Sequence, residues 1–197
     1  MMPARVIAGA AKGRKLKLVP GDSTRPIMDR VKEALFSIIG RDIIDTNFLD
    51  LYAGTGSVGI EALSRGAAHV TFIDLDKLAI QTIYENLKTT KLEANALVRR
   101  ADVLSMLRLP PPRPYHFIYI APPQYKDLWH QTLQLLDNNP AWFTPETDII
   151  VQIDPQERRD RDLTLVNLVE YDQRQYGNTL LWFFSGKEIE ENDDDGL

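Results

Sequence analysis

The sequence predicts an α/β fold in which a mainly parallel β-sheet is covered by helices on both faces. From residue 47 to residue 154, short apolar runs alternate with segments of helical periodicity. This alternation is typical of parallel strands joined by helical crossovers. The stretch 163–184 contains two strand-like runs with no helix between them, joined by a polar turn at Asp172–Asn178. We therefore expect an antiparallel pair to complete the sheet.

The elements before residue 47 predict a hairpin followed by a helix. The runs ARVIA (4–8) and RKLKLV (14–19) have strand character, and GAAKG separates them. The segment 25–40 has helical periodicity, with Pro26 suited to its first turn and Gly40 to its end. One face of this helix is expected to hold Val31, Leu35, Ile38 and Ile39.

The alternating part is assigned from the length and periodicity of each run. Strands are expected at 48–53, 69–74, 96–102, 115–121 and 148–154. Helices are expected at 57–66, 77–90 and 127–138, and RLPPPRP (108–114) is expected to form a loop. No internal repeat and no second domain are indicated.

Composition limits the classes of function. The chain has 197 residues, of which 44% are hydrophobic and 26% charged. No apolar stretch approaches the roughly 18–20 residues of a membrane span, and the N-terminus lacks a secretory signal, so a cytoplasmic protein is expected. The absence of cysteine excludes disulfides, thiolate zinc sites and thiol catalysis. His69, His116 and His130 show no ligand spacing, so no metal site is expected.

Charge is unevenly distributed around a net value of −5. Residues 1–36 carry eight lysines and arginines against three acidic residues. Residues 187–197 carry one lysine against six acidic residues. The pattern predicts a basic N-terminal extension and an acidic, disordered tail.

The stretch FLDLYAGTGSVGIEALSRGA (48–67) predicts a nucleotide-type binding turn. A buried strand runs into a glycine-rich turn, and a helix follows at once; Gly54, Gly56 and Gly59 satisfy the spacing G-x-G-x-x-G. Asp74 lies 20 positions beyond Gly54, at the end of the next strand, where a carboxylate can hold ribose hydroxyls.

The surrounding carboxylates favour S-adenosylmethionine over a dinucleotide. Asp50, in the strand before the glycines, would repel a pyrophosphate and attract an ammonium and a sulfonium. Asp102 follows the third strand and could accept a hydrogen bond from an adenine amine. A nicotinamide-dependent dehydrogenase is the weaker alternative, because no second domain remains for a redox substrate.

The sequence resembles the RsmD-type methyltransferases, which methylate the exocyclic N2 of a guanine in small-subunit (16S) ribosomal RNA. The resemblance covers about residues 4–185 and is carried by RVIAGAAKGRKL, TRPIMDRVKEALFSII, FLDLYAGTGSVGIEALSRGA, VTFIDLD and QYGNTLLWFF. It implies a class I methyltransferase (Rossmann-like) sheet of seven strands with the last strand antiparallel. The expected organisation is an RNA-facing hairpin and helix at 1–40, an S-adenosylmethionine-binding domain at 41–186 and a tail at 187–197.

The resemblance also implies site residues and partners. The cofactor contacts would be Asp50, Ala53, Gly54, Thr55, Gly56, Asp74, Leu75, Asp102 and Val103. The RNA-facing residues would be Arg5, Lys12, Arg14, Lys15, Arg25, Arg30 and Lys32. The expected partner is ribosomal RNA or a small ribosomal subunit particle, bound by a monomer without a metal and away from membranes.

The family's fourth motif, Asp or Asn followed by Pro-Pro-Tyr or Pro-Pro-Phe, departs here to APPQY (121–125). Pro122 and Pro123 match, and prolines fix the strand end so that a carbonyl can accept from the target amine. Tyr125, one residue late, could stack the flipped base. Ala121 cannot supply the side-chain acceptor. Three readings remain open. The protein is a methyltransferase with an adapted motif, in which Asp127 could substitute; or an RNA- and cofactor-binding ribosome-assembly factor that no longer methylates; or a methyltransferase with a different acceptor.

Overall fold

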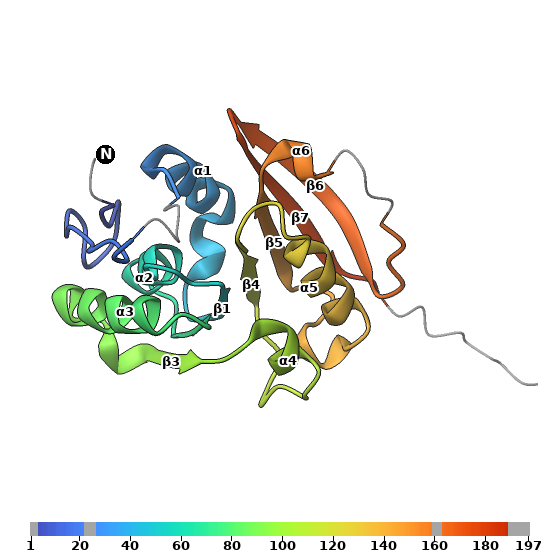
Figure 1. Cartoon of the computed structure of the whole chain (residues 1–197), viewed down its shortest axis with the longest axis horizontal. Helices are drawn as coiled ribbons and strands as arrows, with labels where there is room; N and C mark the ends of the chain where they lie inside the picture. The colour runs from blue at the N-terminus through green and yellow to red at the C-terminus, as the bar shows by residue number, and fades with distance from the viewer. Residues whose placement is uncertain (1–3, 22–26, 159–162, 189–197) are drawn as a thin grey trace, which may run out of the picture.

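A computed structural model describes residues 4–21, 27–158 and 163–188 and contains one seven-stranded sheet (Figure 1). The strand order is β3-β2-β1-β4-β5-β7-β6. The strands are β1 (Asn47–Leu51), β2 (His69–Asp74), β3 (Ala96–Arg100), β4 (Phe117–Ile120), β5 (Asp148–Ile153), β6 (Leu168–Tyr176) and β7 (Thr179–Gly186). β1 to β5 pair in parallel, whereas β7 is antiparallel to both β5 and β6. The predicted fold class is confirmed.

Helices cover both faces of the sheet, as the alternating pattern predicted. They are α1 (Asp29–Ile39), α2 (Ser57–Ser64), α3 (Lys77–Thr90), α4 (Val103–Leu107), α5 (Leu128–Asp137) and α6 (Pro155–Arg158). Three 3₁₀ turns complete the described elements: η1 (Gly40–Ile43), η2 (Glu93–Asn95) and η3 (Pro140–Trp142). α1, α2 and α3 contribute to one core, and α4, α5 and η3 to the other.

The period-2 alternation of β1 places its side chains in two different cores. Phe48 packs with α1 to α3, whereas Leu49 and Leu51 pack with α4 and α5. Asp50 therefore lies on the α2 side of the sheet, among apolar residues. This placement determines what its carboxyl group can contact.

The N-terminal arm, residues 4–21, has the course of a hairpin but only one isolated bridge, between Arg5 and Lys15. The Val6 N–H donates to the Arg14 carbonyl at 2.9 Å, and the Leu16 N–H to the Ala4 carbonyl at 2.7 Å. Longer strands do not form, because the neighbouring backbone groups bond to side chains of α2 and α3 instead. Ala4, Val6 and Leu16 belong to the same core as Phe48, so the arm packs directly on the sheet domain.

Among the differences from the expected elements are two boundaries and one core position. α1 begins at Asp29, later than the predicted residue 25, and Pro26 lies outside the described residues. Phe36 is buried in α1 at 1% exposure, whereas Ile38 is 42% exposed, because the buried face is rotated toward residues 32 and 36. β6 continues to Tyr176, and a Gly177–Asn178 turn replaces the longer predicted turn, because the polar run lies on an edge strand with solvent access.

Candidate cofactor and acceptor site

The glycine turn, residues 52–56, connects the end of β1 to the start of α2. Tyr52, Gly54 and Gly56 all have positive φ angles, of 60°, 56° and 74°. The Ala53 N–H donates to the Ile73 carbonyl at 3.0 Å, which ties the turn to β2. Thr55 and Gly56 are buried, and Ala53 is half-buried. The backbone conformation is therefore the one that the glycines were expected to provide.

Gly59 allows α2 to approach the sheet. A Cβ atom at this position would lie 2.3 Å from the Phe72 ring and 2.8 Å from Val70 Cγ1. Any side chain at this position would push α2 away from β2. It would also move the N-terminal end of α2, which follows the glycine turn directly.

Asp74 occupies the end of β2 and is held by backbone amides. The Gly54 N–H donates to its Oδ2 at 2.8 Å, and the Asp76 N–H donates to its Oδ1 at 2.9 Å. A carboxylate has about four lone-pair positions, so two remain available for ligand hydroxyls. Leu75, the next residue, is exposed, and its carbonyl accepts from Arg100 Nε at 2.9 Å.

Asp102 lies at the start of α4, after the neighbouring strand β3. Its Oδ1 accepts from the Ser105 N–H at 2.8 Å, and hydrogen bonds from Ser105 lower its pKa, so the exposed carboxylate is ionised. Its charge also reaches Tyr52, whose pKa is raised to about 12, chiefly by burial. Val103 is buried in the second core, so only its backbone is available to a ligand.

Asp50 differs from expectation. Its carboxyl is 1% exposed, and Oδ2 accepts from the Gly59 N–H at 2.9 Å. Burial, with a smaller contribution from the Asp74 charge, raises its pKa to about 8. Asp50 therefore lies beneath the first turns of α2 and not in the open at the glycine turn, and its burial favours the protonated form of the carboxyl group.

The acceptor loop, residues 121–127, follows β4, which lies beside β1 in the sheet. Leu51 pairs with Ile120, so the glycine turn and the acceptor loop leave the same edge at neighbouring positions. The strand order changes direction between β1 and β4, and ligands of open α/β sheets bind at such a switch point. The structure thus brings the two predicted halves of the site together.

Within the acceptor loop, the prolines and the tyrosine occupy different environments. Ala121 is half-buried against the first core, and Pro122 is buried, whereas Pro123 is exposed. Tyr125 is 64% exposed and has a left-handed backbone with φ 59°. Asp127, with φ 57°, precedes α5, and its Oδ2 lies 3.8 Å from His130 Nδ1.

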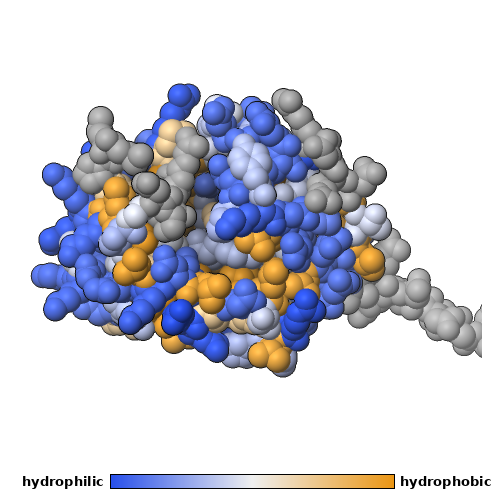
Figure 2. All heavy atoms as spheres, viewed as in Figure 1, coloured by the Kyte–Doolittle hydropathy of each residue, from blue (hydrophilic) through white to orange (hydrophobic). Residues whose placement is uncertain are grey.

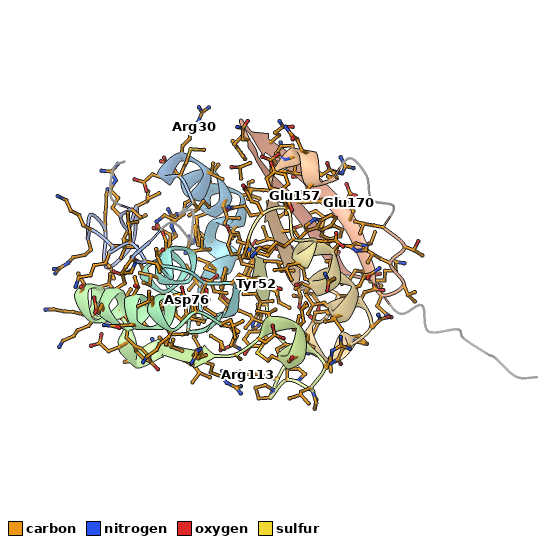
Figure 3. The ribbon with its side chains drawn as sticks, in the orientation of Figure 1. Arg30, Tyr52, Asp76, Arg113, Glu157 and Glu170 are labelled. Carbon is orange, nitrogen blue, oxygen red and sulfur yellow. The ribbon has the colours of Figure 1, made fainter. Side chains whose placement is uncertain are left out.

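Glu157 on α6 contacts the acceptor loop, which the sequence did not indicate. Its Oε2 accepts from the Tyr125 N–H at 3.0 Å, and its Oε1 accepts from the Asp154 N–H at 3.4 Å. Burial raises its pKa, with the nearby charges of Asp154 and Asp127 adding to the effect. In Figure 3, Tyr52 lies near the middle of the view and Glu157 lies above it, near α6.

The expected RNA-facing residues separate into exposed and buried ones. Lys12, Arg14, Lys15 and Arg30 are exposed, as is Arg5, whose Nε lies 3.0 Å from Asp29 Oδ2. Figure 2 shows hydrophilic residues over the side of the molecule formed by the arm and α3, and in Figure 3 Arg30 points away from the sheet. Arg25 lies outside the described residues.

Lys32 was expected to face RNA, and this expectation is wrong. Its side chain is fully buried, with Nζ donating to the Arg5 carbonyl at 2.7 Å and to Ser57 Oγ at 2.8 Å. Nζ also lies 3.6 Å from Glu61 Oε2. Burial lowers the pKa of Lys32, and the neighbouring carboxylate of Glu61 opposes that shift. Lys32 joins the arm and α1 to the first residue of α2.

Two buried polar side chains that sequence reasoning missed anchor the arm. Glu61 accepts from the Ile7 and Ala8 N–H groups at 2.8 and 3.0 Å. Asn86 accepts from the Lys17 N–H at 2.7 Å and donates to the Thr55 carbonyl at 2.9 Å. Asn86 therefore bonds both the arm and the glycine turn. Its signal was a polar residue beside Ile83 and Leu87 on the apolar face of α3.

Within 4–21, 27–158 and 163–188, no group of three or more His, Cys, Asp or Glu side chains is placed to hold a metal ion. In the same part of the chain, no helix combines the length and the apolarity needed to cross a membrane.

The strand order, the antiparallel β7 and the glycine turn after β1 define a class I methyltransferase fold. The chain matches the family described as Conserved hypothetical protein 95 over residues 4–185. It is 46% identical over 135 residues to YlbH of Bacillus subtilis (strain 168), named as a candidate rRNA methyltransferase; the match covers 68% of this chain and 73% of that protein. It is 37% identical over 148 residues to ribosomal RNA small subunit methyltransferase D of Escherichia coli (strain K12), covering 75% and 73%.

A solved structure of yhhF from Escherichia coli, described as a candidate methyltransferase, superposes with a TM-score of 0.81 at 31% identity. The superposition covers 94% of this chain and 99% of that one. The chain belongs to the RsmD-type family.

Proposed function

We propose that this protein is an S-adenosylmethionine-dependent methyltransferase that modifies the exocyclic N2 of a guanine in small-subunit ribosomal RNA. One observation carries the proposal: the glycine turn and the acceptor loop meet at the switch point of the sheet, in a chain of the RsmD-type family. Family members named for small-subunit rRNA methylation supply the substrate class. The guanine N2 specificity rests on the resemblance of the sequence motifs.

The residues around the glycine turn fit S-adenosylmethionine. Asp74 would accept the ribose hydroxyls, because its oxygens are fixed by two amides and keep free lone pairs. The ionised Asp102 would accept from the adenine amine, and the exposed Leu75 would cover the ring. The backbone of 53–56 would line the amino-acid end of the cofactor. When bound, the cofactor supplies an electrophilic methyl group on a sulfonium.

The acceptor loop would orient the target base. The carbonyls of Ala121 and Pro122 would accept the N–H protons of the guanine amine and direct its lone pair toward the methyl group. The exposed Tyr125 ring would stack on the flipped base. Ala121 offers no side-chain acceptor, so orientation depends on the backbone. The proton lost after transfer can pass to water, and the chain needs no strong base.

The exposed cations of the arm and α1 would hold the RNA backbone. Lys12, Arg14, Lys15 and Arg30 are free to reach phosphates, and phosphate contacts position an RNA without reading its sequence. We propose a monomer acting in the cytoplasm on ribosomal RNA or on a small-subunit particle.

Transfer of labelled methyl from S-adenosylmethionine to small ribosomal subunits, purified from a strain that lacks this gene, tests the proposal. The wild-type protein should label one guanine, located by mass mapping of the RNA, and Asp74→Ala should not. A wild-type protein that binds the cofactor and the subunit but transfers no methyl would contradict the proposal. The alternative, a non-methylating assembly factor, would then be favoured, and Ala121→Asp should create activity.

A further inference from the structure

The carboxylate of Glu157 joins two segments at the edge of the sheet where the acceptor base would lie. Its two oxygens accept from the Tyr125 N–H at 3.0 Å and from the Asp154 N–H at 3.4 Å. The first bond spans 32 positions of sequence, from α6 to the acceptor loop. Asp154 follows β5, and its own Oδ1 accepts from the Gln156 N–H at 2.9 Å, which fixes the start of α6. Glu157 thus lies on a helix whose first turn is capped directly after β5.

The residue that Glu157 holds has an unfavourable backbone conformation. A non-glycine residue with a left-handed φ angle costs on the order of 1 kcal/mol or more, and such residues cluster at functional sites. Tyr125 has φ 59°, and its ring is 64% exposed. A left-handed residue turns the chain back on itself and so changes the direction of its side chain. The aromatic residue stands one position late in APPQY, so the direction of its side chain depends on this turn.

The electrostatic surroundings of Glu157 oppose a carboxylate. It is partly desolvated, and both Asp154 and Asp127 add negative charge nearby. The bond from the Asp154 N–H is of the capping-box type and serves the start of α6 itself. The bond from the Tyr125 N–H leaves the helix, so it indicates a role in shaping the acceptor loop.

We propose that Glu157 is a positioning residue that holds Tyr125 in its left-handed conformation and thereby sets the ring against the acceptor base; this inference rests on the proposed function. Glu157 itself does not touch the reacting atoms. It acts through the Tyr125 amide, so its contribution should disappear when the tyrosine ring is absent.

A double-mutant cycle on methyl transfer to small ribosomal subunits tests the proposal. Glu157→Ala should lower kcat/KM by about tenfold, as expected for loss of a hydrogen bond to a charged acceptor. Glu157→Gln keeps one acceptor oxygen for the Tyr125 N–H, turns its NH2 group toward the Asp154 N–H, and should recover part of the activity. Tyr125→Ala should also lower kcat/KM, and adding Glu157→Ala to it should cause no further loss. Gln156→Ala, on the neighbouring exposed residue of α6, is the matched control and should match wild type.

Cofactor affinity and thermal unfolding, measured on the same variants, separate positioning from general damage. Both should remain within error of wild type for Glu157→Gln, so its partial loss of kcat/KM, which should also vanish in the Tyr125→Ala background, tests the inference if Glu157→Ala unfolds. Multiplicative losses in the double variant would overturn the inference, as would wild-type kcat/KM for Glu157→Ala. If either of these two outcomes is found while the wild-type protein transfers methyl groups, the proposed function remains intact. An inactive wild-type protein overturns the proposed function, and the inference with it.

Discussion

Replacement of Lys32 by alanine would remove a buried cation that connects the arm, α1 and α2. The variant loses hydrogen bonds to the Arg5 carbonyl and Ser57 Oγ, and it leaves Glu61 buried without its lysine. Breaking a buried ion pair by removing one partner typically costs about 3–5 kcal/mol. Because Glu61 keeps Arg65 Nε at 2.8 Å and two backbone amides, we expect the lower end, about 3 kcal/mol.

Such a loss should lower Tm by about 6–12 °C for a domain of this size. Urea unfolding followed by circular dichroism measures the change in free energy directly. Arg30→Ala, two positions earlier in α1 and exposed, is the matched control and should stay within about 0.5 kcal/mol of wild type. Lys32→Met should recover part of the loss, because its side chain refills the buried space while Glu61 keeps Arg65 and two backbone amides. Equal stabilities of Lys32→Ala and Arg30→Ala would refute the reasoning.

Three further predictions concern the glycine turn and the acceptor loop. Gly59→Ala should destabilise the protein by about 1–3 kcal/mol in the same unfolding assay, because its methyl would overlap the Phe72 ring; unchanged stability would show that α2 can shift freely. Burial raises the pKa of Asp50 from 3.8 to about 8 in the folded protein. Between pH 4 and pH 8 the folded protein therefore binds more protons than the unfolded chain, and its free energy of unfolding should fall as the pH rises. In Asp50→Asn, the difference between the free energies of unfolding at pH 5 and pH 8, measured by urea titration, should be smaller than in wild type. An equal difference in the two proteins would exclude Asp50 as the source of the pH dependence. Ala121→Asp should raise kcat for methyl transfer by up to about 10²-fold if a side-chain acceptor is what the loop lacks, and an unchanged kcat would show that the backbone carbonyls suffice.

The sheet and the glycine turn could be predicted because their signals are local. A strand followed by Gly54 and Gly56 and then by a helix is readable within ten residues, and the position of Asp74 follows from the next strand. The burial of Lys32 was also readable, since Lys32 shares a helical face with Leu35, Phe36 and Ile39 at spacings of three, four and seven. Its positive charge, within a basic segment, led to the opposite expectation.

Other parts of the site could not be predicted from sequence, because they depend on contacts between distant segments. Glu157 lies on a four-residue helix and meets Tyr125 only through the packing of α6 beside the acceptor loop. The direction of the Asp50 side chain could be predicted only with knowledge of how β1 lies against α2. Such contacts are set by tertiary geometry, and local residue patterns carry little information about them.

The hydrogen bonds of the Asn86 side chain have a thermodynamic consequence for how two ligands affect each other's affinity. Its side chain joins Lys17, in the arm, to the Thr55 carbonyl of the glycine turn. A ligand that shifts one segment therefore changes the energy of the other through a single amide group. Linkage then requires reciprocity: whatever factor cofactor binding applies to RNA affinity, RNA binding must apply to cofactor affinity. Asn86→Ala should reduce that shared factor toward one, although the Asn86 side chain is fully buried.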